Sequence, residues 1–191
     1  MQSTTRYAAC GIVLALCLAG CLEFPLGNPQ SSQVDPALSG YWLAEDDSTA
    51  SLSVLYPYDE HTYVMETFDF NKDNGERKFQ SHAVYKAWLT DVKGHTFLTL
   101  DPLSQHLAPA AADRAYPVLR IDGTGDTRQV RSIDSDFAPF ANAKSSAQIL
   151  AIVTKEVENP KLYTDKVMQY RHLEPHGDEA IIKSMTLSPA Q

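Results

Sequence analysis

The sequence predicts a mainly β domain: an antiparallel meander that forms a barrel or a curved sheet, with one helix near residues 145–158. Three observations support this fold class. Short segments rich in β-branched and aromatic residues recur from Gly40 to Ile133, turn signals separate them, and one later segment has apolar residues at helical spacing. The chain has 191 residues, which is enough for one domain with an ordinary core.

Seven segments have the residue types and the alternation of strands. Valine, threonine, tyrosine and phenylalanine are frequent in them, because β-branched and aromatic side chains pack well on a pleated surface. Pro57 and Pro117 indicate that their segments begin, end or lie at a sheet edge at those points. We therefore expect strands at 40–45, 51–58, 61–70, 81–91, 95–100, 116–122 and 127–133.

Three dipeptides between these segments suit hairpin turns. Asn74-Gly75, Lys93-Gly94 and Asp122-Gly123 each contain a glycine, which takes positive φ without strain. Because hairpin follows hairpin, neighbouring strands should be antiparallel. The alanine-rich residues 104–115 are either a loop or one short helix.

The helix begins near Ser145 and Ser146, both of which suit an N-cap. Ile149 and Val153 recur at helical spacing, and Asn159-Pro160 ends the helix, since the residue before a proline avoids the α region. An extended segment is expected at 166–173, with a further candidate at 181–187.

The N-terminal residues resemble the signal peptide of a bacterial lipoprotein. Arg6 supplies a positive charge, 7–19 form an apolar run, and Leu18-Ala19-Gly20-Cys21 resembles the lipobox that ends such signals. The run is shorter than the 20 or so apolar residues of a spanning helix. The resemblance implies cleavage before Cys21, which then carries a thioether diacylglycerol and an amide-linked acyl chain such as palmitate. The alternative is an uncleaved anchor or a secretory signal with a chance cysteine.

This resemblance divides the chain into a signal peptide (1–20), a lipidated Cys21 with a flexible tether (21–37), and one β-rich domain (38–191). The tether is expected because residues 22–37 are rich in proline, glycine, asparagine and serine. In the family, an aspartate after the cysteine commonly retains the protein at the inner membrane. Leu22 stands there instead, so the resemblance implies an outer-membrane lipoprotein facing the periplasm; in a host with a single membrane it would sit on the cell membrane.

Charge and cysteine content limit the partners. The chain carries a net charge of −8, and loss of residues 1–20 removes one base and no acid, which leaves −9. Like charges repel, so binding to nucleic acid is disfavoured, and membrane attachment should come from the lipid. Cys10 and Cys17 leave with the signal peptide, so the mature domain has no disulfide and no cysteine-based metal site.

The start of the domain resembles a lipocalin. The resemblance covers Gly40-x-Trp42 and the order of elements: a meander, then a helix and a last strand. It implies that Trp42 closes one end of a small barrel, and that an arginine from a late strand, here Arg171, packs over it. The middle motif of that family has no counterpart. The chain also resembles small uncharacterised lipoproteins of Gram-negative bacteria in length and layout.

No catalytic, cofactor or metal site is predicted. Residues 69–75 have oxygen ligands at alternate positions like a calcium loop, but Gly75 falls one position late and Gln80 replaces the closing glutamate. Pro175 breaks any helix through His172 and His176, so a helical zinc pair is excluded. The chain lacks a Gly-x-Ser-x-Gly elbow and a Ser-x-x-Lys motif, and the acidic runs 45–47 and 134–136 are typical of solvated strand ends.

Two non-enzymatic functions fit these observations. In the first, the barrel binds a small apolar or amphiphilic molecule. In the second, a barrel with a solid core binds an envelope protein or assists envelope assembly. The candidates for lining a cavity or filling the core are Trp42, Tyr63, Tyr85, Trp88, Phe97 and Arg171.

The lipobox gives a direct prediction. Cys21→Ser should leave an uncleaved and unlipidated precursor, because the acylated thiol is required for processing. Mass spectrometry of the N-terminal peptide measures both events. Recovery of acylated, membrane-extracted protein from this variant would contradict the assignment.

Overall fold

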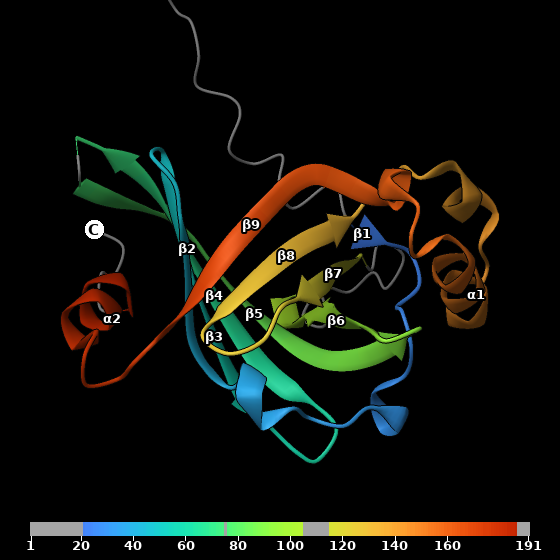
Figure 1. The fold of residues 1–191 in the computed structure, drawn as a ribbon, viewed down its shortest axis with the longest axis horizontal. Coiled ribbons are helices and arrows are strands. Elements are labelled where there is room, and N and C mark those ends of the chain that lie inside the picture. The colour runs from blue at the N-terminus through green and yellow to red at the C-terminus, as the bar shows by residue number, and fades with distance from the viewer. Residues whose placement is uncertain (1–20, 75, 105–114, 187–191) are drawn as a thin grey trace, which may run out of the picture.

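The fold is a closed antiparallel β-barrel in a computed structural model that describes residues 21–74, 76–104 and 115–186 (Figure 1). A two-residue strand β1 (Cys21–Leu22) pairs with the wall of the barrel from outside its closed ring. The eight barrel strands are β2 (Gly40–Glu45), β3 (Thr49–Pro57), β4 (Tyr63–Asp73), β5 (Glu76–Val92), β6 (His95–Pro102), β7 (Tyr116–Asp122), β8 (Thr127–Ile133) and β9 (Tyr163–Leu173).

Pairing of the last strand with the first closes the barrel. β9 pairs with β8 along most of its length and with β2 at its end, where Trp42 lies opposite His172. The barrel, not the open curved sheet, is therefore the correct alternative. Every pairing is antiparallel, as expected for a meander. No helix in the described part of the chain is long and apolar enough to cross a bilayer.

Two of the three predicted hairpin turns lie in described residues; the β5–β6 turn forms as expected, whereas Asp122 of the β7–β8 hairpin is the last residue of β7 and lacks positive φ. Lys93 and Gly94 have φ values of 54° and 81°, so both central positions of the β5–β6 turn are left-handed. Gly123 has φ 94° in the β7–β8 turn. In the third turn Asn74 has φ 51°, and Gly75 lies outside the described residues. The predicted loop or helix at 104–115 falls almost wholly outside them as well.

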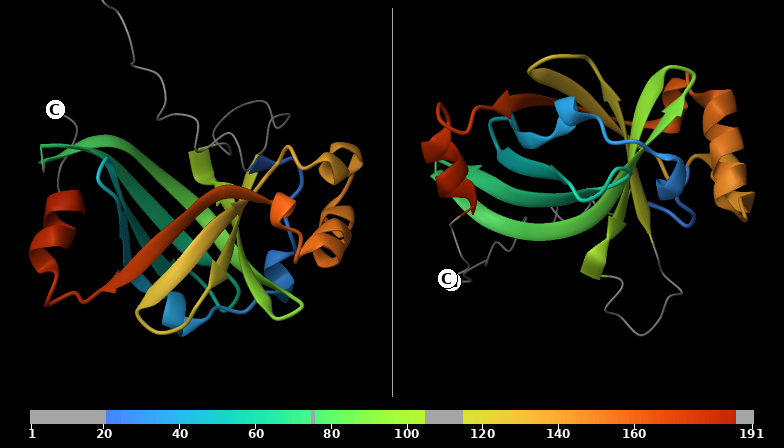
Figure 2. Two further views of the ribbon diagram at one scale, coloured as in Figure 1. Left: turned by 45° about the horizontal axis from the view of Figure 1, so that its top comes forward. Right: turned by 90° about the horizontal axis from the view of Figure 1, so that it is seen from below.

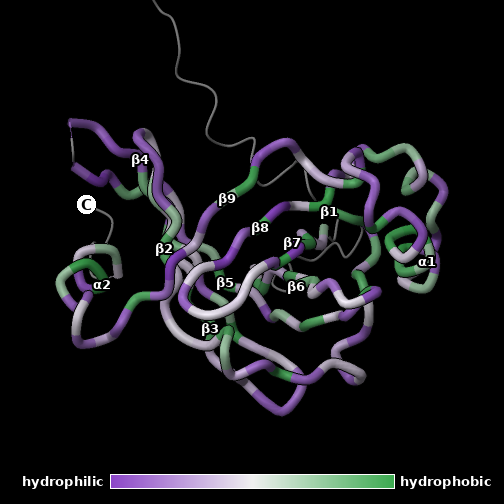
Figure 3. Tube along the Cα trace, in the orientation of Figure 1, coloured by the Kyte–Doolittle hydropathy of each residue, from purple (hydrophilic) through white to green (hydrophobic). Residues whose placement is uncertain are grey.

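The β4–β5 hairpin extends beyond the barrel, and its tip is hydrophilic (Figure 3). Glu45 of β2 accepts a hydrogen bond of 2.8 Å from Arg77, and Asp73 pairs with Lys78 at 2.6 Å. These pairs hold the polar extension to its neighbours, although exposed pairs contribute little stability.

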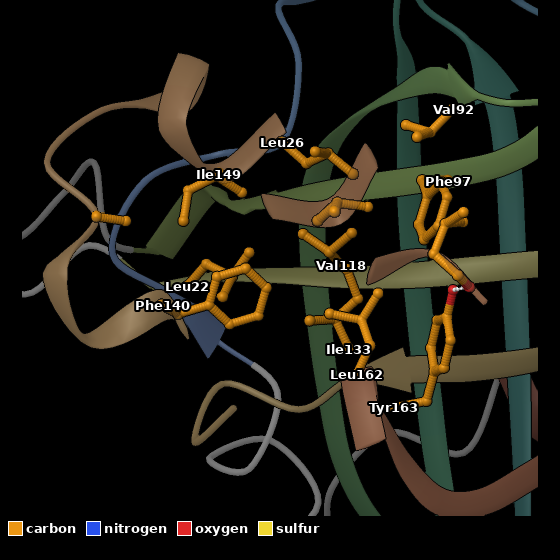
Figure 4. Close-up of a cluster of buried hydrophobic side chains, with 13 residues drawn as sticks. Leu22, Leu26, Val92, Phe97, Val118, Ile133, Phe140, Ile149, Leu162 and Tyr163 are labelled. Carbon is orange, nitrogen blue, oxygen red and sulfur yellow. Dashed lines mark hydrogen bonds between the residues drawn. The ribbon is translucent and has the colours of Figure 1, made fainter. Parts of the chain in front are cut away.

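Helix α1 (Ser146–Glu156) connects β8 to β9 and packs on the outside of the barrel. The Ser145 side chain caps its N-terminus by accepting from the Gln148 amide at 3.4 Å. Ile149 and Val153 are buried in a cluster with Val118 of β7 and Ile133 of β8 (Figure 4). The predicted helix is thus present with nearly the predicted bounds.

A second helix, α2 (Glu179–Thr186), corrects the prediction of an extended segment at 181–187. Ile181, Ile182 and Met185 occur at helical spacing, and they pack against the outer face of β2–β4, beside Leu43 and Leu52. The apolar pair Ile181-Ile182 favoured a strand by composition alone, and burial of one helical face outweighs that preference.

Side chains alternate between the lumen and the outer surface along each strand. The inner positions form one apolar cluster, which includes Trp42, Leu55, Tyr63, Met65 and Leu98. The outer positions form two clusters, one under α1 and one under α2. Three small hydrophobic clusters therefore stabilise the barrel. The two outer clusters are buried only because α1 and α2 cover them.

Residues 21–38 differ from the expected flexible tether, because they pack along the barrel. Short 3-10 turns η2 (Pro29–Ser31) and η3 (Pro36–Leu38) shape the segment, and Leu26 is fully buried. The Ser32 hydroxyl accepts from the Leu89 amide at 2.9 Å, and the Val34 amide donates to Glu60 at 3.2 Å. Seen from below, the segment crosses the end of the barrel (Figure 2, right). Polar residues and prolines dominate this segment, but three buried leucines hold it on the barrel: Leu22, Leu26 and Leu38.

The packing of α2 is testable. Met185 is 1% exposed, so Met185→Ala should lower the free energy of unfolding by about 2–4 kcal/mol through the lost burial and the cavity left behind. Lys183→Ala on the exposed side of the same helix is the matched control and should cost less than about 0.5 kcal/mol. Urea denaturation measures both values; equal, small effects would show that α2 does not pack on the barrel.

Candidate functional site

Gly40 and Trp42 close one end of the barrel. Gly40 has φ 117°, and a Cβ added there would lie 2.6 Å from His172 Nε2, so the position requires glycine. Trp42 points into the lumen, where its Nε1 donates to the Leu38 carbonyl at 2.9 Å. The His172 ring packs edge-on against the indole, with centroids 4.9 Å apart. The Gly-x-Trp spacing therefore has a physical basis at this end.

An arginine does cover Trp42, but it is Arg128 of β8. Its guanidinium carbon lies 5.1 Å from the centre of the indole, a distance suited to a cation–π interaction. Its Nη1 donates to the carbonyl oxygens of Thr127, at 3.0 Å, and of Gly125. Arg128 is 7% exposed, and no carboxylate of the described residues pairs with it. The indole face and backbone carbonyls together compensate for the buried charge.

Arg171, expected at this place, lies elsewhere. It is on the outer side of β9, because its neighbours Tyr170 and His172 face inward. Its guanidinium pairs with Asp178 at 3.3 Å, and its side chain is 45% exposed. The sequence contained a signal for the correct residue: Arg128 alternates with Val130, and both line the lumen.

The lumen holds a small cavity of about 50 Å³. Its lining is apolar except for Ser53, Arg128 and Tyr170, and Leu98 and Ile121 are among the apolar residues. Pockets that bind small organic molecules measure about 300–1,000 Å³. Side chains thus fill most of the barrel interior, and the remaining space suits a few atoms.

Two hydroxyl groups line this cavity in addition to the Arg128 guanidinium. Ser53 is 3% exposed, and its hydroxyl has no hydrogen-bond partner of normal geometry within the described residues. Burial raises the pKa of Tyr170, and the facing hydroxyls of Ser53 and Ser51 oppose that shift. This pair is the polar feature of the cavity that could orient a bound molecule.

The other predicted residues divide between the two faces of the barrel wall. Tyr63 and Tyr85 join Trp42 in the inner cluster, and Tyr63 donates to the Asp35 carbonyl at 3.0 Å. Burial is the main cause that raises the pKa of Tyr63 to about 12. Trp88 and Phe97 lie on the outer face: Trp88 Nε1 donates to the Leu26 carbonyl at 3.0 Å, and Phe97 belongs to the cluster under α1. They are core residues and cannot contact a molecule in the lumen.

The acidic and histidine motifs are structural. Asp69 accepts hydrogen bonds from Ser51 at 2.8 Å and from Ser81 at 2.9 Å, which ties β3, β4 and β5 together. His172 packs on Trp42, and its Nδ1 lies 3.7 Å from Glu174. Nowhere in residues 21–74, 76–104 and 115–186 do three histidine, cysteine, aspartate or glutamate side chains gather as a metal site would require.

A short aromatic strip lies on the outer surface near the closed end. It consists of Tyr41, Tyr56 and Tyr58. Tyr56 donates to the Tyr41 hydroxyl at 2.8 Å, and their rings meet edge-on at 6.3 Å. Tyr56 and Tyr58 are 45% and 71% exposed. Partial burial of Tyr56 and its hydrogen bond to Tyr41 raise the pKa of Tyr56 to about 12, so the Tyr56 phenol stays neutral in ordinary buffers.

Comparison with known proteins finds no family, no curated protein and no solved structure that matches this chain.

The assignment of the arginine over Trp42 is testable by paired substitutions. Arg128→Ala removes the indole contact and two charged hydrogen bonds, so it should lower the free energy of unfolding by about 2–4 kcal/mol. Arg171→Ala removes an exposed ion pair and should cost less than about 1 kcal/mol. Urea denaturation followed by tryptophan fluorescence measures both; the reverse order would show that Arg171 holds the closed end.

Proposed function

We propose that this protein is a cell-envelope lipoprotein, anchored by acyl chains on Cys21, whose barrel is a solid scaffold that binds another envelope component through its outer surface. The observation that carries the proposal is the filled lumen, with a cavity of only about 50 Å³. A barrel of eight strands has just enough interior for its own side chains, and here Trp42 and Arg128 occupy much of one end.

The anchor rests on the lipobox Leu18-Ala19-Gly20-Cys21, of which Cys21 alone is described. With Leu22 after the cysteine, the proposed location is the outer membrane, facing the periplasm. The net charge of −8 gives no reason to expect nucleic acid as a partner.

The aromatic strip supports binding through the outer surface. Tyrosine combines a large apolar ring with a polar hydroxyl, and it is enriched at protein interfaces for that reason. Tyr56 and Tyr58 are the two most exposed large apolar side chains of the described residues; Tyr56 lies near the end of β3, and Tyr58 directly follows that strand. The exposed tyrosines of this strip therefore suit the binding of another protein of the cell envelope.

A second function rests on the hydroxyls of Ser53 and Tyr170. The Ser53 hydroxyl faces Tyr170 without a hydrogen bond of normal geometry, so a ligand or water that bonds to Ser53 would be favoured. An apolar or amphiphilic molecule would have to displace neighbouring side chains to enter. Its headgroup would lie at these hydroxyls and its apolar part along Leu98 and Ile121.

Native mass spectrometry separates the two functions. The sample is the Cys21→Ser chain from residue 21, exported to the periplasm through a non-lipoprotein signal, because a shorter chain would lose buried Leu22 and Leu26. We expect the bare mass of the polypeptide, since the cavity is too small for a retained ligand.

Extra mass that survives desalting would contradict the solid scaffold if a lumen-filling variant, Ser53→Leu, abolishes it. Tyr58→Ser on the outer surface is the matched control, and it should leave lumen-bound mass unchanged. Extra mass lost from Tyr58→Ser alone would indicate binding at the strip.

A further inference from the structure

Cys21, the residue proposed to carry the lipid, is paired with the barrel wall from outside the closed ring. As part of β1, it lies opposite Pro117 at the start of β7, and the next residue, Leu22, lies opposite Tyr116. Leu22 is 3% exposed. The lipid attachment point is therefore held at one end of the barrel, not at the end of a loose chain.

The residues after β1 keep it there. The Leu26 carbonyl accepts hydrogen bonds from Trp88 at 3.0 Å and from Thr99 at 2.9 Å. Gly27 has φ 73°, and a Cβ added to it would lie 2.1 Å from the Thr90 hydroxyl, so the backbone touches β5 directly. A flexible chain of 16 residues would instead have a root-mean-square length of roughly 20–24 Å, and any face of the barrel could meet the bilayer.

An uncharged apolar turn lies beside β1. It is the 3-10 turn η6 (Ala138–Asn142), in which Ala138, Pro139 and Ala141 are exposed. Phe140 of this turn is buried next to Leu22 in the cluster under α1, and the close-up shows the two side chains together (Figure 4). The turn is thus fixed near the attachment point and presents small apolar groups to the outside.

We propose that the end of the barrel formed by β1 and η6 lies against the bilayer, so that the protein stands in one fixed orientation. This inference rests on the lipid attachment proposed above. Acyl chains leaving Cys21 bring η6 to the membrane surface, where its apolar groups meet lipid. Asp134 and Asp136 border the turn, so the contact suits zwitterionic lipid better than anionic lipid.

The orientation also places the aromatic strip. β7 runs away from Cys21, and its seven residues at about 3.3 Å each span about 20 Å along the strand, so the β7–β8 turn lies at the end of the barrel away from the bilayer. Arg128 links that turn to Trp42 at the closed end, where β3 ends near Tyr56. The strip therefore points away from the anchoring membrane, toward partners in the aqueous space.

The test uses the lipidated protein in phosphatidylcholine vesicles that contain nitroxide-labelled phosphatidylcholine. The processed chain has no other thiol, so Ala138→Cys and Thr124→Cys each give one site for an environment-sensitive fluorophore. Both positions are exposed, one in η6 and one in the β7–β8 turn. We expect the nitroxide lipid to quench the fluorophore at 138 severalfold more than the one at 124.

Equal quenching at the two sites, whether strong or absent, would overturn the fixed orientation. Gly27→Ala in both labelled chains should release the segment and reduce the difference, and circular dichroism checks that the barrel stays folded. If Gly27→Ala unfolds the protein, the comparison of quenching at positions 138 and 124 in chains that keep Gly27 still tests the fixed orientation. Mass spectrometry of the N-terminal peptide keeps the two proposals separate: an unacylated Cys21 refutes the anchor itself, whereas an acylated Cys21 with equal quenching refutes only the orientation.

Discussion

The pairing of β9 with β2 is the interaction on which the rest of the structure depends. It removes both open edges of the meander and brings His172 against Trp42, where Arg128 from β8 covers the indole. Without this closure Trp42 and the buried guanidinium would face solvent at an open edge. Closure also fixes the interior at a size that its own side chains nearly fill, which is why the proposed function uses the outer surface.

A barrel this small leaves apolar side chains on its outer face, and these need their own cover. α1 covers the wall near β7 and β8, and α2 covers β2–β4. The chain before β2 completes the cover: Leu22 and Leu26 fill part of the cluster under α1, and Val34 packs against the inner cluster. The N-terminal segment is therefore a structural part of the domain, and Cys21, the proposed lipid attachment point, is held against the barrel with it.

Sequence reasoning predicted the strands well, because alternation and glycine turns are local signals. The bounds of β7 and β8 and the Lys93-Gly94 turn follow from such signals. It could not say which face of the wall a side chain occupies, since both faces are apolar here: Trp88 and Phe97 resemble lumen residues in composition and lie outside. The expectation that Arg171 covers Trp42 is wrong because register across β8, β9 and β2 decides which arginine reaches the indole.

The segment 21–38 shows how composition can mislead about rigidity. Proline, glycine and asparagine are frequent in flexible linkers, but here they form short turns between apolar anchors. Asn28 and Asp35 cap η2 and η3, and each is followed by a proline at the first position of the turn. Their polar side chains satisfy backbone groups locally, so the segment can lie on the barrel without a partner strand along most of its length. Because this segment is fixed to the barrel, the position of Cys21 determines the orientation of the whole domain. A lipid anchor on Cys21 would therefore give the protein a defined outward face, which the barrel alone would not provide.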